Sequence, residues 1–157
     1  MNSAITWGDF EPPRIAGGMS LTALSTSLVS ARLSDWEALA EAMRAIERLE
    51  DDWDDLGSSA PTQEVSASAF VFFDWLRQWD PTNPPDRILA SPTGSYIFEW
   101  QPEGMVVEAE IQDPWIVEFS VKQHSEEPEY WQLRLARESA KDPLWEQFPP
   151  VVRSVAA

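Results

Sequence analysis

The fold is decided by the stretch SYIFEWQPEGMVVEAEIQDPWIVEFSVK, residues 95–122. Apolar and polar side chains alternate in it with a period of two, and the turn-forming sequences QPEG and QDPW interrupt the alternation. A period of two places every second side chain on the same side of a β-strand, and short turns between such runs are typical of antiparallel hairpins. This stretch therefore predicts consecutive strands of an antiparallel sheet.

The alternation continues on both sides of this stretch, so we expect a meander of four or five strands. They cover residues 87–91, 95–100, 105–111, 116–122 and 130–136. One face of the sheet would be covered by helices. Its side chains are Tyr96, Phe98, Trp100, Met105, Val107, Ala109, Ile111, Val117, Phe119, Val121, Trp131, Leu133 and Leu135. The opposite face would carry Glu99, Glu108, Glu110 and Glu118, with Arg134 as a counter-ion.

Two helices are predicted before the sheet. The first begins at Ser34, which together with Glu37 forms a capping box. Its apolar residues recur at spacings of three and four: Trp36, Leu39, Met43, Ile46 and Leu49. The second begins at Thr62, and its buried face is expected to contain Val65, Ala69, Phe72, Phe73, Leu76 and Trp79. The sequence DPTNPP, residues 80–85, ends it because proline does not fit inside a helix.

These elements predict an α+β protein. Two N-terminal helices pack on one face of a four- to five-stranded antiparallel meander sheet, and a short C-terminal helical turn follows at residues 141–148. A chain of 157 residues fits one domain, which we place at residues 34–148. Residues 1–33 are expected to be an arm that is flexible or ordered by a partner, and residues 149–157 a tail.

The charge of the chain is concentrated in its middle. Residues 50–120 contain 15 acidic residues against Arg77 and Arg87, so they carry −13 of the net charge of −16. Such a field repels nucleic acid and anionic lipid and favours a basic partner protein, although acidity also serves solubility. Cysteine is absent, and the N-terminal residues lack the basic and apolar regions of a signal peptide. We expect a cytoplasmic protein without a membrane segment.

Several kinds of catalysis lack their usual residues. The single histidine, His124, lies in a turn-like sequence, which disfavours a hydrolase triad. Neither of the glycine-rich phosphate-binding motifs is present, so no cofactor is expected. Paired glutamates such as Glu99 with Glu110 or Glu118 leave a carboxylate-dependent enzyme open as an alternative.

The sequence LEDDWDDLGSSAPT, residues 49–62, places five carboxylates around Trp53. A calcium-binding loop of the EF-hand type needs alternating ligands, a central glycine and a distal glutamate, and this order is missing here. We therefore expect a solvated acidic loop between the two helices and no metal site.

This loop and the following sheet together resemble a dispersed group of small uncharacterised bacterial proteins. The resemblance rests on a W-D-x-x-G-x-x-x-P loop between two helices, here residues 53–61, and on a P-x-G-x-x-x-x-E-W strand meander, here residues 92–100. It covers about residues 36–122, and this chain departs from the pattern at Leu56 and Ser58. The resemblance implies a fold and a bacterial origin but no reaction.

The loop positions that this chain shares with the group it resembles are predicted to have structural roles. Asp54 would accept backbone N–H bonds, Gly57 would supply a positive φ, and Pro61 would begin the second helix. Trp53 would tuck under the sheet. The pair Glu99-Trp100 would pack against the loop, whose positions Glu50, Asp51, Asp52 and Asp55 would be free to vary.

The favoured function is a non-enzymatic module that binds a basic partner protein. Immunity proteins, antitoxins and accessory subunits of defence systems are the analogous roles. The expected partner-binding residues are Trp7, Phe10, Asp51, Asp52, Asp55, Glu108, Glu110 and Glu118. One alternative is a small-ligand or carbohydrate-binding domain with a pocket formed by several of Trp53, Trp75, Trp79 and Trp100. The other is a carboxylate-dependent enzyme, which requires two of Glu99, Glu108, Glu110 and Glu118 close together in a cleft, with a raised pKa at one of them at least.

Overall fold

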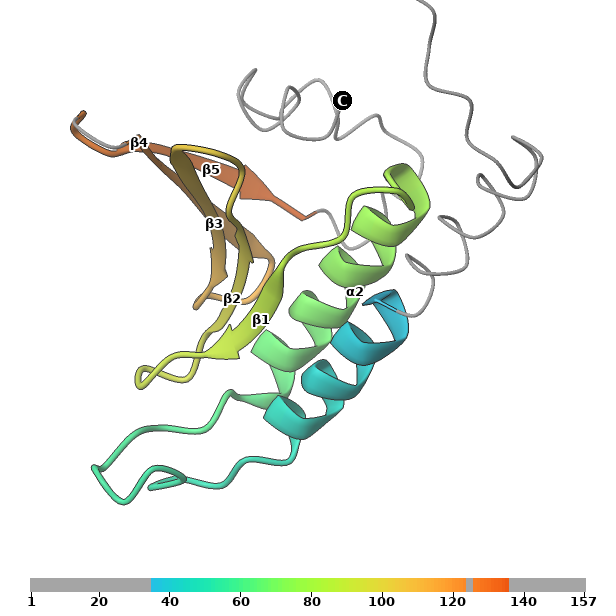
Figure 1. The fold of residues 1–157 in the computed structure, drawn as a ribbon. Coiled ribbons are helices and arrows are strands. Elements are labelled where there is room, and N and C mark those ends of the chain that lie inside the picture. Colours follow the sequence, from blue (N-terminus) through green and yellow to red (C-terminus); the bar gives the residue numbers. More distant parts are fainter. Residues whose placement is uncertain (1–34, 124–125, 136–157) are drawn as a thin grey trace, which may run out of the picture.

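The computed structural model describes residues 35–123 and 126–135. Two helices are followed by a five-stranded antiparallel sheet with the strand order β1-β2-β3-β4-β5 (Figure 1). The predicted α+β class and the antiparallel meander are confirmed. The predicted arm, C-terminal helical turn and tail lie outside the described residues, as do Trp7 and Phe10.

The first helix covers residues 35–47 and the second, α2, covers Gln63–Trp79. Thr62, where the second helix was predicted to begin, caps α2: its side-chain oxygen accepts the backbone N–H of Val65 at 3.3 Å. The indole of Trp36, which is fully buried, donates to the carbonyl of Pro81 at 2.8 Å. This bond fixes the beginning of the first helix to the segment that follows α2.

The strands are β1 (Arg87–Ala90), β2 (Tyr96–Trp100), β3 (Met105–Ile111), β4 (Ile116–Gln123) and β5 (Glu129–Arg134). Each is paired in antiparallel register with the next along the chain. The register follows from the alternation, because a slip by one residue would move every apolar side chain to the wrong face.

Both helices lie on one face of the sheet (Figure 1). Phe72 of α2 is fully buried, with ring centroids 5.1 Å from Phe98 on β2 and 6.1 Å from Phe119 on β4. The predicted inner face of the sheet is buried, except that Met105 and Trp131 are only partly covered. The core therefore forms between the helices and this face, and the predicted glutamates lie on the other.

Among the residues that the structure describes, no helix combines the length and the apolar character needed to cross a membrane.

Candidate functional site

The face of the sheet that points away from the two helices, here called the outer face, brings together acidic residues from three strands. Glu99 on β2 is directly opposite Glu108 on β3, and Glu110 on β3 is directly opposite Glu118 on β4. Directly opposed residues have Cβ atoms about 4.5–5.5 Å apart, and like charges at this distance destabilise a sheet. The acidic side chains of this face are therefore closely spaced.

Glu99 differs from the others because a cation neutralises it. Arg87 donates from Nε to Oε1 at 2.8 Å and from Nη2 to Oε2 at 3.0 Å, and the Gln101 amide also donates to Oε1. Only 4% of Glu99 is exposed. The hydrogen bonds from Arg87 hold the pKa of Glu99 below its usual value, and they raise the pKa of Arg87. A general acid needs the opposite shift in pKa, so Glu99 is suited to an ion pair.

Arg134 was predicted to be one counter-ion on the outer face, and this prediction is corrected by the ion pairs of the described residues. Arg134 is paired in register with Ile116, the first residue of β4, and no ion pair of Arg134 is found within the described part of the chain. Arg87 takes the role because it lies directly opposite Glu99 on the neighbouring strand β1.

The three remaining glutamates of the outer face, Glu108, Glu110 and Glu118, are called here the outer carboxylate cluster. Each accepts a hydrogen bond from a neutral side chain. The bonds run from Ser120 to Glu108 at 3.2 Å, from Ser95 to Glu110 at 2.5 Å and from Gln132 to Glu118 at 2.5 Å. Within residues 35–123 and 126–135, no cation lies within ion-pair distance of the cluster. The carboxylates are thus held in place by neutral donors, and Arg87, which is bound to Glu99, acts on Glu108 only through a longer-range charge interaction.

A chain of hydroxyl groups orients Glu110. Ser95 gives its only side-chain proton to Glu110, so it accepts the bond that joins it to Ser91, 2.6 Å away. Ser91 in turn accepts from Thr93 at 2.7 Å. Ser95 is fully buried, so it holds the carboxylate of Glu110 without reaching solvent itself.

The acidic loop, residues 49–62, is an ordered structure closed by its own carboxylates. Asp54 accepts from the backbone N–H of Leu56 and from both the N–H and the hydroxyl of Ser58. The hydroxyl bond, at 2.6 Å, is the main cause that lowers the pKa of Asp54. The predicted role of Asp54 is confirmed, and Gly57 has the predicted positive φ, at 86°.

Two further carboxylates of the acidic loop also have structural contacts. Asp51 accepts the N–H of Ala60 at 2.9 Å, and Asp52 accepts the N–H of Gly57 at 2.7 Å. Both positions were expected to be free to vary, and these bonds correct that expectation. Asp55 is exposed. Of the three predicted partner-binding residues of the loop, Asp51 and Asp52 are the two whose side chains accept these backbone bonds.

Trp53 does not tuck under the sheet as predicted. Trp53 is 36% exposed, and its indole N–H donates to the Ser59 carbonyl within the loop at 3.2 Å. The loop instead meets the sheet at the turn between β1 and β2, where the N–H of Ser59 donates to the carbonyl of Pro92 at 2.9 Å. Glu99 faces Arg87 and Trp100 is buried in the core, so the expected packing of this pair against the loop is replaced by the turn contact.

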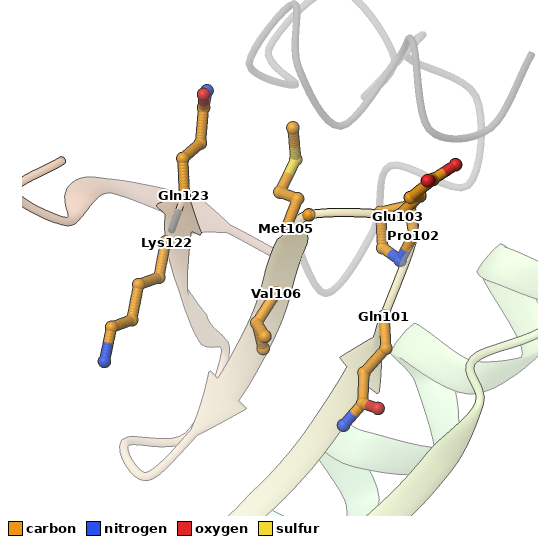
Figure 2. Close-up of a pocket in the computed structure, with 8 residues that line it drawn as sticks. Gln101, Pro102, Glu103, Met105, Val106, Lys122 and Gln123 are labelled. Carbon is orange, nitrogen blue, oxygen red and sulfur yellow. The ribbon is translucent and has the colours of Figure 1, made fainter. Parts of the chain in front are cut away.

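An open groove of about 540 Å³ lies where the β2–β3 turn meets the end of β4 (Figure 2). In Figure 2, Val106 and Lys122 point to one side of the sheet, and Met105 and Gln123 point to the other. The lining residues are Gln101, Pro102, Glu103, Gly104, Met105, Val106, Lys122 and Gln123. None of them is a tryptophan of the pocket expected for the ligand-binding alternative.

The tryptophans proposed for such a pocket are distributed over the molecule. Trp100 is buried on the inner face of the sheet, and Trp53 belongs to the acidic loop. Trp75 and Trp79 stack on each other along α2 with ring centroids 5.4 Å apart. A group of three or more side chains able to hold a metal ion is not found in the described ranges.

The outer carboxylate cluster contains three of the predicted partner-binding residues, and the register brings them together. The sequence reasoning missed Arg87 as the partner of Glu99 and missed the neutral donors Ser95, Ser120 and Gln132. The alternation of side chains was the available signal, because it places Ser120 on the same face as Glu118. It did not show which residue of the neighbouring strand lies opposite.

Comparison of the chain with protein-family models, with curated proteins and with solved structures gave no match.

Proposed function

We propose that this chain is a non-enzymatic acidic interaction module that binds a basic partner protein. The observation that carries the proposal is the outer carboxylate cluster, in which Glu110 and Glu118 are opposed across two strands and held by neutral donors. Opposed like charges cost stability in the free protein. A partner that brings lysine or arginine to this face offsets that cost and gains charge-assisted hydrogen bonds.

The arrangement favours binding over chemistry at the same face. Glu108 and Glu118 accept bonds from Ser120 and Gln132, which are polar but carry no charge. A carboxylate held in one geometry loses little conformational freedom when a cation arrives, so more of the interaction energy contributes to affinity. The proposed partner is a protein, since the net charge of −16 repels nucleic acid and anionic membranes.

Small acidic bacterial proteins include immunity proteins, antitoxins and accessory subunits of defence systems, and we propose a role of this kind by analogy. A bacterial origin and a cytoplasmic location belong to the same proposal. Trp7 and Phe10 are proposed to add apolar contacts from the arm at residues 1–33.

The test is affinity capture with the full chain from a bacterial lysate at low and high salt, followed by reconstitution with the purified partner. We expect a stoichiometric basic protein that is released at high salt, because screening weakens contacts between exposed charges. The full chain carrying Trp7→Ala and Phe10→Ala should retain less of it. Capture of nothing, or of an acidic protein insensitive to salt, contradicts the proposed function.

A further inference from the structure

We infer that the outer face of the sheet is the docking surface, and that its occupant is a basic protein surface whose lysine or arginine side chains are flanked by apolar ones. This inference deepens the proposed function and rests on it. It assigns the surface and the chemistry of the partner, where the proposed function requires only that a basic protein is bound.

The surface is a sheet face that the two helices leave uncovered, since both pack on the inner face (Figure 1). Exposed apolar side chains lie on its two edge strands: Leu89 on β1 is 37% exposed and Tyr130 on β5 is 72% exposed. Ile97 on β2 and Ile116 on β4 are half-buried on the same face. Apolar surface that remains accessible beside charged groups is characteristic of protein interaction sites.

The register arranges these side chains in cross-strand rows. Leu89 is opposite Ile97, Ile97 is opposite Glu110, and Glu110 is opposite Glu118. In the neighbouring row, Glu108 is opposite Ser120, and Ser120 is opposite Tyr130. The outer carboxylate cluster thus occupies β3 and β4. The row of Glu110 is apolar toward the β1 edge, and the row of Glu108 ends at Tyr130 on the β5 edge.

This pattern distinguishes between possible occupants. A second copy of the chain, related by a two-fold axis through this face, would place the outer carboxylate cluster against its own equivalent. Such a dimer is disfavoured because like charges would be buried together. A basic surface with flanking apolar groups is complementary to both parts of the pattern.

The cations of the described chain leave the centre of the face open. Arg87 is engaged by Glu99 on the side of β1, while Lys122 and Arg134 lie near the ends of β4 and β5. The centre therefore carries the negative charge and the periphery carries the positive charge. A partner with its basic residues at the centre of its own surface fits this distribution.

The test compares two variants of the full chain that remove equal charge from different places. Glu110→Gln with Glu118→Gln removes two of the three charges of the outer carboxylate cluster, and the amide oxygens still accept the bonds from Ser95 and Gln132. Glu50→Gln with Asp55→Asn neutralises two exposed residues of the acidic loop and is the matched control. The probe is a synthetic amphipathic helix of leucine and lysine, studied by calorimetry and by amide chemical shifts.

We expect the outer-face variant to weaken binding of the peptide about tenfold and the loop variant less than about twofold. In the wild-type chain the largest shifts should fall on β3 and β4. Equal weakening by both variants, or shifts centred on the acidic loop, would overturn the docking surface while a basic partner remained possible. Absence of binding at low salt would instead contradict the proposed function as well.

Folding of the outer-face variant is checked by its thermal midpoint, which should equal or exceed that of the wild type because opposed like charges are removed. The oligomeric state of the wild-type chain is measured by sedimentation, with and without the peptide. A dimer that the peptide dissociates would show that the occupant is a second copy, which overturns the inference.

Discussion

Gly94 in the β1–β2 turn lies against the backbone of Ala60 in the acidic loop: a Cβ added to Gly94 would be 2.8 Å from the Ala60 carbonyl oxygen. Real Cβ atoms essentially never approach backbone that closely. The hydrogen bond from Ser59 to the Pro92 carbonyl lies at the same contact. The acidic loop and the sheet are therefore joined at a point where only glycine fits.

We predict that Gly94→Ala destabilises the protein by about 2–4 kcal/mol, because it combines a positive φ of 80° with the clash against Ala60. The control is Gly104→Ala, which has a similar φ of 76° but open space around the added Cβ. It should cost about 1 kcal/mol. Denaturant unfolding of both variants measures the difference, and equal losses would refute the role of the close approach.

The ion pair between Arg87 and Glu99 should show strong coupling. Arg87→Ala leaves a nearly buried carboxylate without its cation, so we expect the thermal midpoint to fall by about 5 °C. Replacing both residues, by Arg87→Met and Glu99→Leu, should restore much of the loss since no unpaired charge remains. If the loss of stability in the double variant equals the sum of the losses in the two single variants, the pair is not coupled.

The same pair makes stability depend on pH. The pKa of Glu99 is lower in the folded protein than its ordinary value of 4.5, so the folded state favours the ionised carboxylate. Its contribution is fully present above pH 4.5 and is lost as the pH falls through the folded pKa. The gap in stability between the wild type and Glu99→Gln should therefore narrow on acidification, as followed by urea unfolding at several pH values. A constant gap would contradict the pKa shift.

In the acidic loop, Asp54 and Asp55 should behave differently although they are adjacent and equally charged. Asp54→Ala removes the acceptor of three hydrogen bonds, so we expect a decrease of a few degrees in the thermal midpoint and faster amide exchange at Leu56 and Ser58. Asp55→Ala leaves these bonds intact, and Asp55→Asn also keeps a residue that tolerates a φ of 58°. Asp55→Asn should leave the midpoint unchanged, and equal effects of Asp54→Ala and Asp55→Asn would argue against the loop network.

Much of the fold followed from local patterns. The alternation around Val107 and Phe119 predicted the strands and their inner face, and the cap at Thr62 predicted the beginning of α2. These predictions succeed because burial on one face imposes a period on the sequence, and because a cap is a contact between residues three positions apart.

The position of Trp53 shows where such reasoning fails. Large aromatic residues are usually buried, yet this ring stays in the loop because its indole N–H bonds to Ser59 and the loop contacts the sheet through Pro92. Nothing in the local sequence indicates which surface the loop will meet, since that contact joins residues more than 30 positions apart.

The sequence by itself determined the α+β class, the order of the elements, the face of each strand and the excess of negative charge. The tertiary structure decided which charges are neutralised, because that depends on which side chains the register places opposite each other. Glu99 lies opposite Arg87 and is paired, whereas Glu110 lies opposite Glu118 and is not. The candidate site consists of the glutamates that have no such cation opposite them. It arises from strand pairing between residues that are distant in sequence.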